Sequence, residues 1–178
     1  MRQSSFHERK MKCTIFIAGI PGSGKSRFGQ WLSVEKGFVH VDMESDGLDH
    51  FDLREPWDTF RSDSGDHSAF PLALERLDSN ICLDWGFPVE CMPIIERIKA
   101  LSSKMVWFEA DRLHAREGYL RKPNSSAAAF DCQVAKISLA WQQIERMFRP
   151  NFFHTMREDG TLIPPAELYN IVSANQLG

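Results

Sequence analysis

The eight residues Gly19–Ser26 read GIPGSGKS and directly follow the short apolar run KCTIFIA, Lys12–Ala18. A glycine, four further residues and then Gly-Lys-Ser have the spacing of a P-loop, a backbone turn that surrounds phosphate groups. Because glycine lacks a Cβ, such a loop can curl until several N–H groups approach one anion. The alternative is a Gly/Ser-rich turn without a ligand, but the apolar run before it and the helical pattern after it favour the P-loop.

Each position of this loop has a chemical role in nucleotide binding. The helix that follows presents its N-terminus, and therefore a favourable dipole, to the phosphates. Lys25 can reach the β- and γ-phosphates of ATP, and the Ser26 hydroxyl can bind Mg²⁺. The predicted nucleotide-binding residues are Gly22, Ser23, Gly24, Lys25 and Ser26.

Strand-like and helix-like patterns alternate along the rest of the chain, which predicts an α/β fold with a parallel sheet covered on both faces. Strands are expected at 14–17, 38–41, 80–84, 105–110 and within 152–156. Helices are expected from the P-loop to Gly37, at 69–77, 94–101, 111–120 and 130–148, and from Pro164 onward. Residues 42–66 form a polar, acidic stretch with little periodicity, and residues 1–11 are expected to be a loose tail of one domain, 1–178.

Composition narrows the class of protein. The chain has 178 residues and a formal net charge of −3, so it carries no general basic footprint for nucleic acid. Its four cysteines contain no C-x-x-C pair and are too sparse for a disulfide framework, which favours reduced thiols in the cytoplasm. No apolar run is long enough to cross a bilayer.

Acidic residues follow the second and third predicted strands, where parallel sheets bind their ligands. Strand two ends in VDMESD and strand three in LDWGF. Asp42 or Asp84 can act as a general base, and Asp84, after the apolar run ICL, has the position of a Walker-B acid that holds Mg²⁺. The alternative is that Asp42 caps a turn and Asp84 caps the next helix. The predicted acceptor-site residues are Asp42, Glu44, Gly86 and Trp85 or Phe87, whose ring would stack on the acceptor.

GIPGSGKS, VDMESD and LDWGF together resemble the small P-loop kinases. The resemblance is strongest to the group of zeta toxins, chloramphenicol phosphotransferase and polynucleotide 5′-kinase, with shikimate and gluconate kinases more distant. It spans nearly the whole chain and implies a strand order of 2-3-1-4-5. It also implies that Asp42 contacts the acceptor hydroxyl. Some relatives have Asp-x-Asp there; this chain has Asp-Met-Glu, so Glu44 is expected to share the role.

The stretch WFEADRLHAREGYLRKPNSS, Trp107–Ser126, resembles the fourth strand, helix and lid of these kinases. Residues 112–128 are therefore expected to form a small lid that closes over ATP. Arg116 and Arg121 match the arginines that stabilise charge on the transferred phosphoryl group, whereas Arg112 is expected to face solvent. The alternative is a solvated helix face with salt bridges.

The leading interpretation is an ATP- and Mg²⁺-dependent kinase that phosphorylates a hydroxyl group of a small molecule. A polynucleotide or nucleotide kinase is less favoured, because the acidic loop at residues 42–58 should repel phosphate-rich acceptors. A nucleotide-binding switch without transferase activity is a third hypothesis; no Asn-Lys-x-Asp stretch is present, and Trp85 stands where an ATPase would have a catalytic glutamate. The acceptor and the oligomeric state are not predicted. The acidic residues of the loop are Asp42, Glu44, Asp46, Asp49, Asp52, Glu55 and Asp58.

Overall fold

A computed structural model describes residues 13–44, 46–86, 89–102 and 104–174; the predicted tail at 1–11 and Phe87 lie outside the described residues. Five strands form one parallel sheet with the order β2-β3-β1-β4-β5, which confirms the order implied by the resemblance. The strands are β1 (Thr14–Gly19), β2 (Val39–Asp42), β3 (Ile81–Asp84), β4 (Lys104–Glu109) and β5 (Phe152–His154).

Helices connect the strands, and every predicted helix has a counterpart. They are α1 (Lys25–Lys36), α2 (Gly47–His50), α3 (Arg54–Arg61), α4 (Ala69–Glu75), the 3₁₀ helix η1 (Val89–Ile94), α5 (Ile95–Leu101), α6 (Arg112–Leu120), α7 (Ala127–Leu139), α8 (Trp141–Phe148) and α9 (Pro165–Ala174). Gly37 ends α1 in the left-handed conformation, as the sequence predicts.

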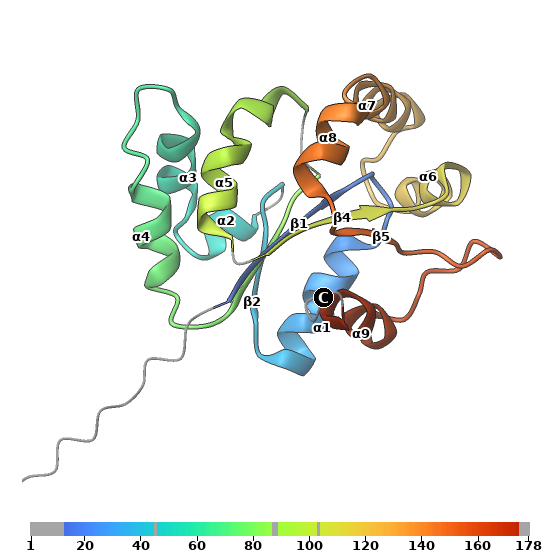
Figure 1. Ribbon diagram of the computed structural model, residues 1–178, viewed down its shortest axis with the longest axis horizontal. Coiled ribbons are helices and arrows are strands. Elements are labelled where there is room, and N and C mark those ends of the chain that lie inside the picture. Colours follow the sequence, from blue (N-terminus) through green and yellow to red (C-terminus); the bar gives the residue numbers. More distant parts are fainter. Residues whose placement is uncertain (1–12, 45, 87–88, 103, 175–178) are drawn as a thin grey trace, which may run out of the picture.

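Two apolar layers enclose the sheet (Figure 1). On one face, Phe28 and Leu32 of α1 and Leu168 of α9 pack against side chains of β1 and β4. On the other face, α3, α4, α5, α7 and α8 cover a larger core that includes Trp57 and Trp107. Because side chains alternate along a strand, successive sheet residues belong to different layers, and the carboxyl ends of the strands meet at one edge.

The acidic stretch after β2 is more ordered than expected. Residues 42–66 contain α2 and α3, where the sequence analysis found little periodicity. α2 has only four residues, too few to show a period. Leu53, Trp57 and Phe60 do stand at helical spacing and are buried, so this apolar signal was present among the surrounding charges.

The predicted long helix at 130–148 is wrong in one respect, because it is divided at Ala140 into α7 and α8. The Ser138 hydroxyl donates to the Val134 carbonyl oxygen at 2.8 Å, a contact that bends helices. The apolar period nevertheless continues across the bend, since Ile137 and Ile144 are both buried. Within the described part of the chain, no helix is long and apolar enough to cross a membrane.

Candidate active site

The P-loop joins β1 to α1 at the centre of the carboxyl edge of the sheet. Gly22 and Gly24 adopt positive φ values of 78° and 87°, which glycine tolerates and other residues rarely adopt. The loop packs closely against α6: a Cβ atom on Gly22 would lie 2.0 Å from the Ala115 carbonyl oxygen. Glycine is therefore required at Gly22 both by the backbone conformation and by the close approach of α6.

Two polar side chains of the loop lie inside it. Lys25 donates hydrogen bonds from Nζ to the carbonyl oxygens of Gly19 and Ile20, at 3.1 and 2.9 Å. The Ser23 hydroxyl is buried and, among the described residues, has no hydrogen-bond partner. A buried hydroxyl without a partner is unfavourable, so this loop fits a ligand rich in acceptor oxygens. A phosphate group has that chemistry.

The charge on Lys25 is balanced by acids from two other strands. Its pKa is lowered, chiefly because burial removes the hydration of the ammonium group, while the carboxylates of Asp84 and Glu44 oppose that effect. The Lys122 ammonium lowers it further. A bound phosphate would add negative charge beside this lysine and favour its protonated form.

Asp42 and Asp84 are register partners at the ends of neighbouring strands. The Asp84 carboxylate is buried and faces the Lys25 side of the sheet, so it does not cap a helix. No group of three or more His, Cys, Asp or Glu side chains in the described ranges is placed to hold a metal ion alone. Proteins usually hold Mg²⁺ with one or two side chains plus substrate phosphates. Ser26 and Asp84 would hold it, and when bound it would neutralise phosphate charge.

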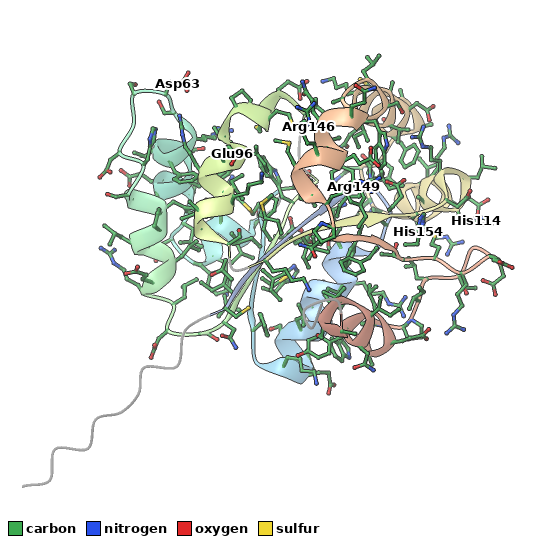
Figure 2. The ribbon with its side chains drawn as sticks, in the orientation of Figure 1. Asp63, Glu96, His114, Arg146, Arg149 and His154 are labelled. Carbon is green, nitrogen blue, oxygen red and sulfur yellow. The ribbon has the colours of Figure 1, made fainter. Side chains whose placement is uncertain are left out.

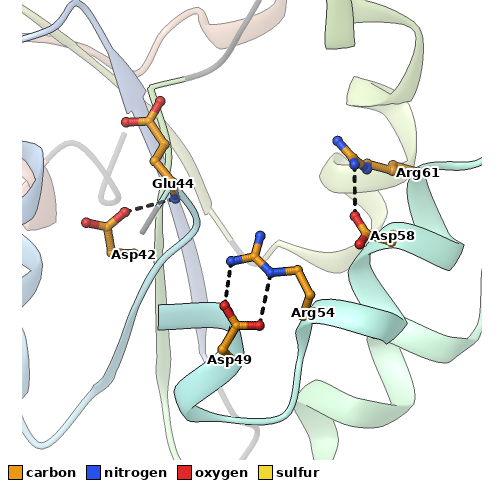
Figure 3. A network of polar contacts seen from close by, with 6 residues as sticks. All are labelled: Asp42, Glu44, Asp49, Arg54, Asp58 and Arg61. Carbon is orange, nitrogen blue, oxygen red and sulfur yellow. Dashed lines mark hydrogen bonds and ion pairs between the residues drawn. The ribbon is translucent and has the colours of Figure 1, made fainter. Parts of the chain in front are cut away.

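Asp42 ends β2 and Glu44 follows two residues later, at the carboxyl edge of the sheet (Figure 3). This edge, beside the P-loop, is called the opening. Asp42 Oδ1 accepts a hydrogen bond from the Glu44 backbone N–H at 2.9 Å, so the turn-capping contact of the alternative interpretation is present. Glu44 extends across Gly86, since a Cβ atom there would lie 2.1 Å from Glu44 Oε1. The Glu44 side chain is exposed there.

The surroundings of Glu44 change the proton affinity of its carboxylate. Its pKa is raised, first because neighbouring atoms restrict hydration of the carboxylate, and also because Asp42 and Asp84 repel the charge. Lys25 and Lys122 oppose this rise. Lys122 follows α6 and was missed by the sequence analysis, which considered only arginines in the lid.

Trp85 does not offer a stacking face. Its side chain is buried in the core, with ring centroids 6.2 Å from Phe16 and 5.2 Å from Trp57, both in edge-on contact. The expected stacking of Trp85 on an acceptor is therefore wrong: side-chain alternation directs this residue into the large core layer. Gly86 remains at the opening, where the Gln133 side chain donates a hydrogen bond to its carbonyl oxygen at 3.0 Å.

The lid arginines have different surroundings. Arg116 forms a two-point contact with Asp131 of α7, with Nε 3.1 Å from Oδ1. Arg112 donates to the Ser138 hydroxyl at 3.1 Å, and Arg121 is exposed. The predicted catalytic roles of Arg116 and Arg121 stay predictions. For Arg116, the role requires release from Asp131.

Part of the acidic charge that follows β2 is neutralised by nearby arginines. Asp49 and Arg54 form two hydrogen bonds, of 3.1 and 2.9 Å, and Asp58 pairs with Arg61 at 2.9 Å (Figure 3). These ion pairs are exposed and contribute little to stability. They do occupy the two arginines that follow β2.

A separate cavity of about 790 Å³ lies between α8 and β5 at the edge of the sheet and extends to Glu109 at the end of β4. Arg149 and His154, which line it, are labelled in Figure 2. Arg149 is paired with Glu145, and Arg112 is bonded to Ser138, so its arginines already have partners. The P-loop, with its buried unpaired hydroxyl, is the stronger candidate for a ligand site.

The sequence matches no model of a known protein family and no sequence of a characterised protein. Solved structures do resemble it. A shikimate kinase from Acinetobacter baumannii in complex with shikimate is 14% identical, with a TM-score of 0.56 over 94% of this chain and 97% of that one. A shikimate kinase from Bacteroides thetaiotaomicron is 13% identical, with a TM-score of 0.53 over 92% and 96%.

A gluconokinase from Sinorhizobium meliloti 1021 is 14% identical, with a TM-score of 0.50 over 93% of this chain and 92% of that one. The chain has the P-loop kinase fold. At these identities the likeness concerns the fold alone. The finer resemblance to the zeta toxin and polynucleotide 5′-kinase group stays a prediction.

Proposed function

We propose that this protein is an ATP- and Mg²⁺-dependent kinase that transfers the γ-phosphoryl group to a hydroxyl of a small molecule. The observation that carries the proposal is the P-loop, in which the buried Ser23 hydroxyl has no hydrogen-bond partner among the described residues and Lys25 interacts electrostatically with the carboxylates of Asp84 and Asp42. The likeness of the fold to shikimate kinases and a gluconokinase supports a small-molecule acceptor.

The proposed step is a direct transfer. The acceptor oxygen attacks the γ-phosphorus as the bond to the β-phosphate oxygen breaks, and ADP leaves. Asp42 takes the proton of the acceptor hydroxyl; it is half-buried at the opening, whereas Asp84 is only 2% exposed behind it. Lys25 and the lid residues Arg116 and Arg121 stabilise negative charge on the transferred group.

The charges around the opening favour a neutral or amine-bearing acceptor. Shikimate and gluconate each carry a carboxylate, which a kinase would hold with cationic side chains. Here three arginines that follow β2 or belong to α5 are engaged: Arg54 with Asp49, Arg61 with Asp58, and Arg97 with the Phe60 carbonyl oxygen. Asp42 and Glu44 would in addition repel an anionic acceptor.

The same charges argue against the other two functions. A polynucleotide or nucleotide kinase needs cations that bind acceptor phosphates, and the opening presents the carboxylates of Asp42 and Glu44 instead. A switch without transferase activity would not need two acids at the opening. It stays the hypothesis to adopt if ATP binds and no acceptor is phosphorylated.

A transfer assay with γ-³²P-labelled ATP tests the proposal. The panel should contain neutral polyols and sugars, amino sugars and aminoglycosides, hydroxy acids including shikimate and gluconate, nucleoside monophosphates and oligonucleotides. We expect label in a neutral or cationic compound, and its loss in Asp42→Asn, which keeps the shape but removes the proton acceptor. Label only in oligonucleotides or nucleotides would refute the proposed acceptor class and favour the alternative kinase.

A further inference from the structure

Asp84 has a neighbour that the mechanism above does not use. His40 lies on β2, and its Nε2 atom is 3.4 Å from Asp84 Oδ2. Both side chains are largely enclosed, with 11% of His40 and 3% of Asp84 exposed. A buried carboxylate needs hydrogen-bond donors, and the His40 tautomer with the proton on Nε2 provides one.

The imidazole ring of His40 occupies space that only a glycine at position 29 leaves open. A Cβ atom on Gly29, in the middle of α1, would lie 2.3 Å from both Cδ2 and Nε2 of His40. A glycine inside a helix costs about 0.5–1 kcal/mol relative to alanine. Its presence here is explained by the space that the imidazole occupies between α1 and the sheet.

These contacts form a chain from the helix to the phosphate site. Gly29 admits the ring, the ring contacts one oxygen of Asp84, and the Asp84 carboxylate interacts electrostatically with Lys25. The Asp84 side chain has two rotatable bonds, so a second contact restricts the directions in which its oxygens point. Groups that hold a metal-binding side chain in this way tune metal affinity without touching the metal.

We propose that His40 is a positioning residue that holds the Asp84 carboxylate in the orientation needed to bind Mg²⁺ with the nucleotide, and that Gly29 exists to admit its ring. This inference rests on the proposed function, because it presumes that Mg²⁺ accompanies a nucleotide in the P-loop. A histidine that only filled space would contribute to folding and would leave the metal dependence of nucleotide binding unchanged.

Calorimetry of ADP binding with and without Mg²⁺ separates the two roles. His40→Leu keeps a side chain of similar size and removes the donor, whereas His40→Gln keeps a donor near the position of Nε2. We expect His40→Leu to lose about tenfold in the gain of ADP affinity that Mg²⁺ provides, with unchanged affinity in its absence. His40→Gln should retain most of that gain, and the exposed His67→Leu should behave like wild type.

Gly29→Ala provides a second test that alters no polar atom. The added methyl group displaces the ring, so this variant should lose the Mg²⁺-dependent gain as His40→Leu does, and the double variant should lose no more than either. It also keeps the proposal testable if His40→Leu fails to fold. Magnesium-dependent gains in both variants within about twofold of wild type would overturn the proposal, as would equal losses in His40→Leu and His40→Gln. A wild-type protein that binds no ADP, or binds it without regard to Mg²⁺, would contradict the proposed function itself and this inference with it.

Discussion

Gly22→Ala should destabilise the protein and disable the P-loop, and Gly37→Ala provides a matched control. Both glycines have positive φ, 78° and 68°, so each alanine variant places an L-residue in the left-handed region at a cost of about 1–2 kcal/mol. A Cβ atom on Gly37 would meet nothing within 4 Å. Gly37→Ala therefore measures the backbone cost alone.

Gly22→Ala adds a steric cost to the backbone cost. Its Cβ atom would lie 2.0 Å from the Ala115 carbonyl oxygen and 2.8 Å from the carbonyl carbon, so α6 and the loop must separate. Overpacking of this kind costs about 1–3 kcal/mol, which gives a total near 2–5 kcal/mol. Gly118→Ala, on the α6 side of the same contact, would have only the Gly22 carbonyl oxygen, at 3.7 Å, within reach. It should stabilise the protein by about 0.5–1 kcal/mol through helix propensity.

Urea unfolding at equilibrium measures all three variants, and calorimetry with ADP measures their nucleotide affinity. We expect Gly22→Ala to lose ADP binding, since the loop amides can no longer converge, and the two control variants to keep it. Equal destabilisation by Gly22→Ala and Gly37→Ala would refute the packing of α6 on the loop. Normal ADP binding by a folded Gly22→Ala would refute the role of the loop backbone.

Two further predictions concern the lid arginines and Glu44. Arg116→Ala or Arg121→Ala should lower kcat at least about tenfold with little change in ATP affinity, because these arginines act on the transferred phosphoryl group. Arg112→Ala is the control, because the Arg112 side chain is bonded to Ser138. Unchanged turnover in both test variants would show that Arg116 and Arg121 are only surface charges. Glu44→Gln should stabilise the fold at neutral pH by less than about 1 kcal/mol, because the folded state raises the pKa of Glu44 and so disfavours its charged form. That gain should shrink as the pH falls through the Glu44 pKa, and a gain that grows toward acid in urea titrations would contradict the assigned shift.

The main parts of the fold and the phosphate site were predictable because they depend on short-range patterns. Buried parallel strands are apolar runs, and the P-loop is a fixed spacing of glycines and a lysine. The break at Ala140 was not predictable from the apolar period, because the period continues through it and Ile137 and Ile144 are both buried. The hydrogen bond from the Ser138 hydroxyl to the Val134 carbonyl oxygen involves polar atoms that the apolar pattern does not register.

The acceptor side depended on contacts between distant segments, which spacing does not encode. Glu44 crosses Gly86, His40 reaches Asp84, and Lys122 approaches Lys25 only after the sheet has formed. For His40, the available signal in the sequence was Gly29, a glycine inside a helix. Trp85 was misassigned because it directly follows β3 and continues the side-chain alternation of that strand into the core.

The most direct test of the central claim is the affinity of the wild-type protein for Mg·ATP, measured by calorimetry beside Lys25→Ala. Lys36→Ala, at the end of the same helix, removes an equal charge away from the loop. We predict one ATP site per chain, a loss of about 10- to 100-fold in Lys25→Ala because charge-assisted contacts to phosphate disappear, and no change in Lys36→Ala. Equal ATP affinity in wild type and Lys25→Ala, or no binding to the folded wild-type protein, would contradict the assignment of this loop as a nucleotide site.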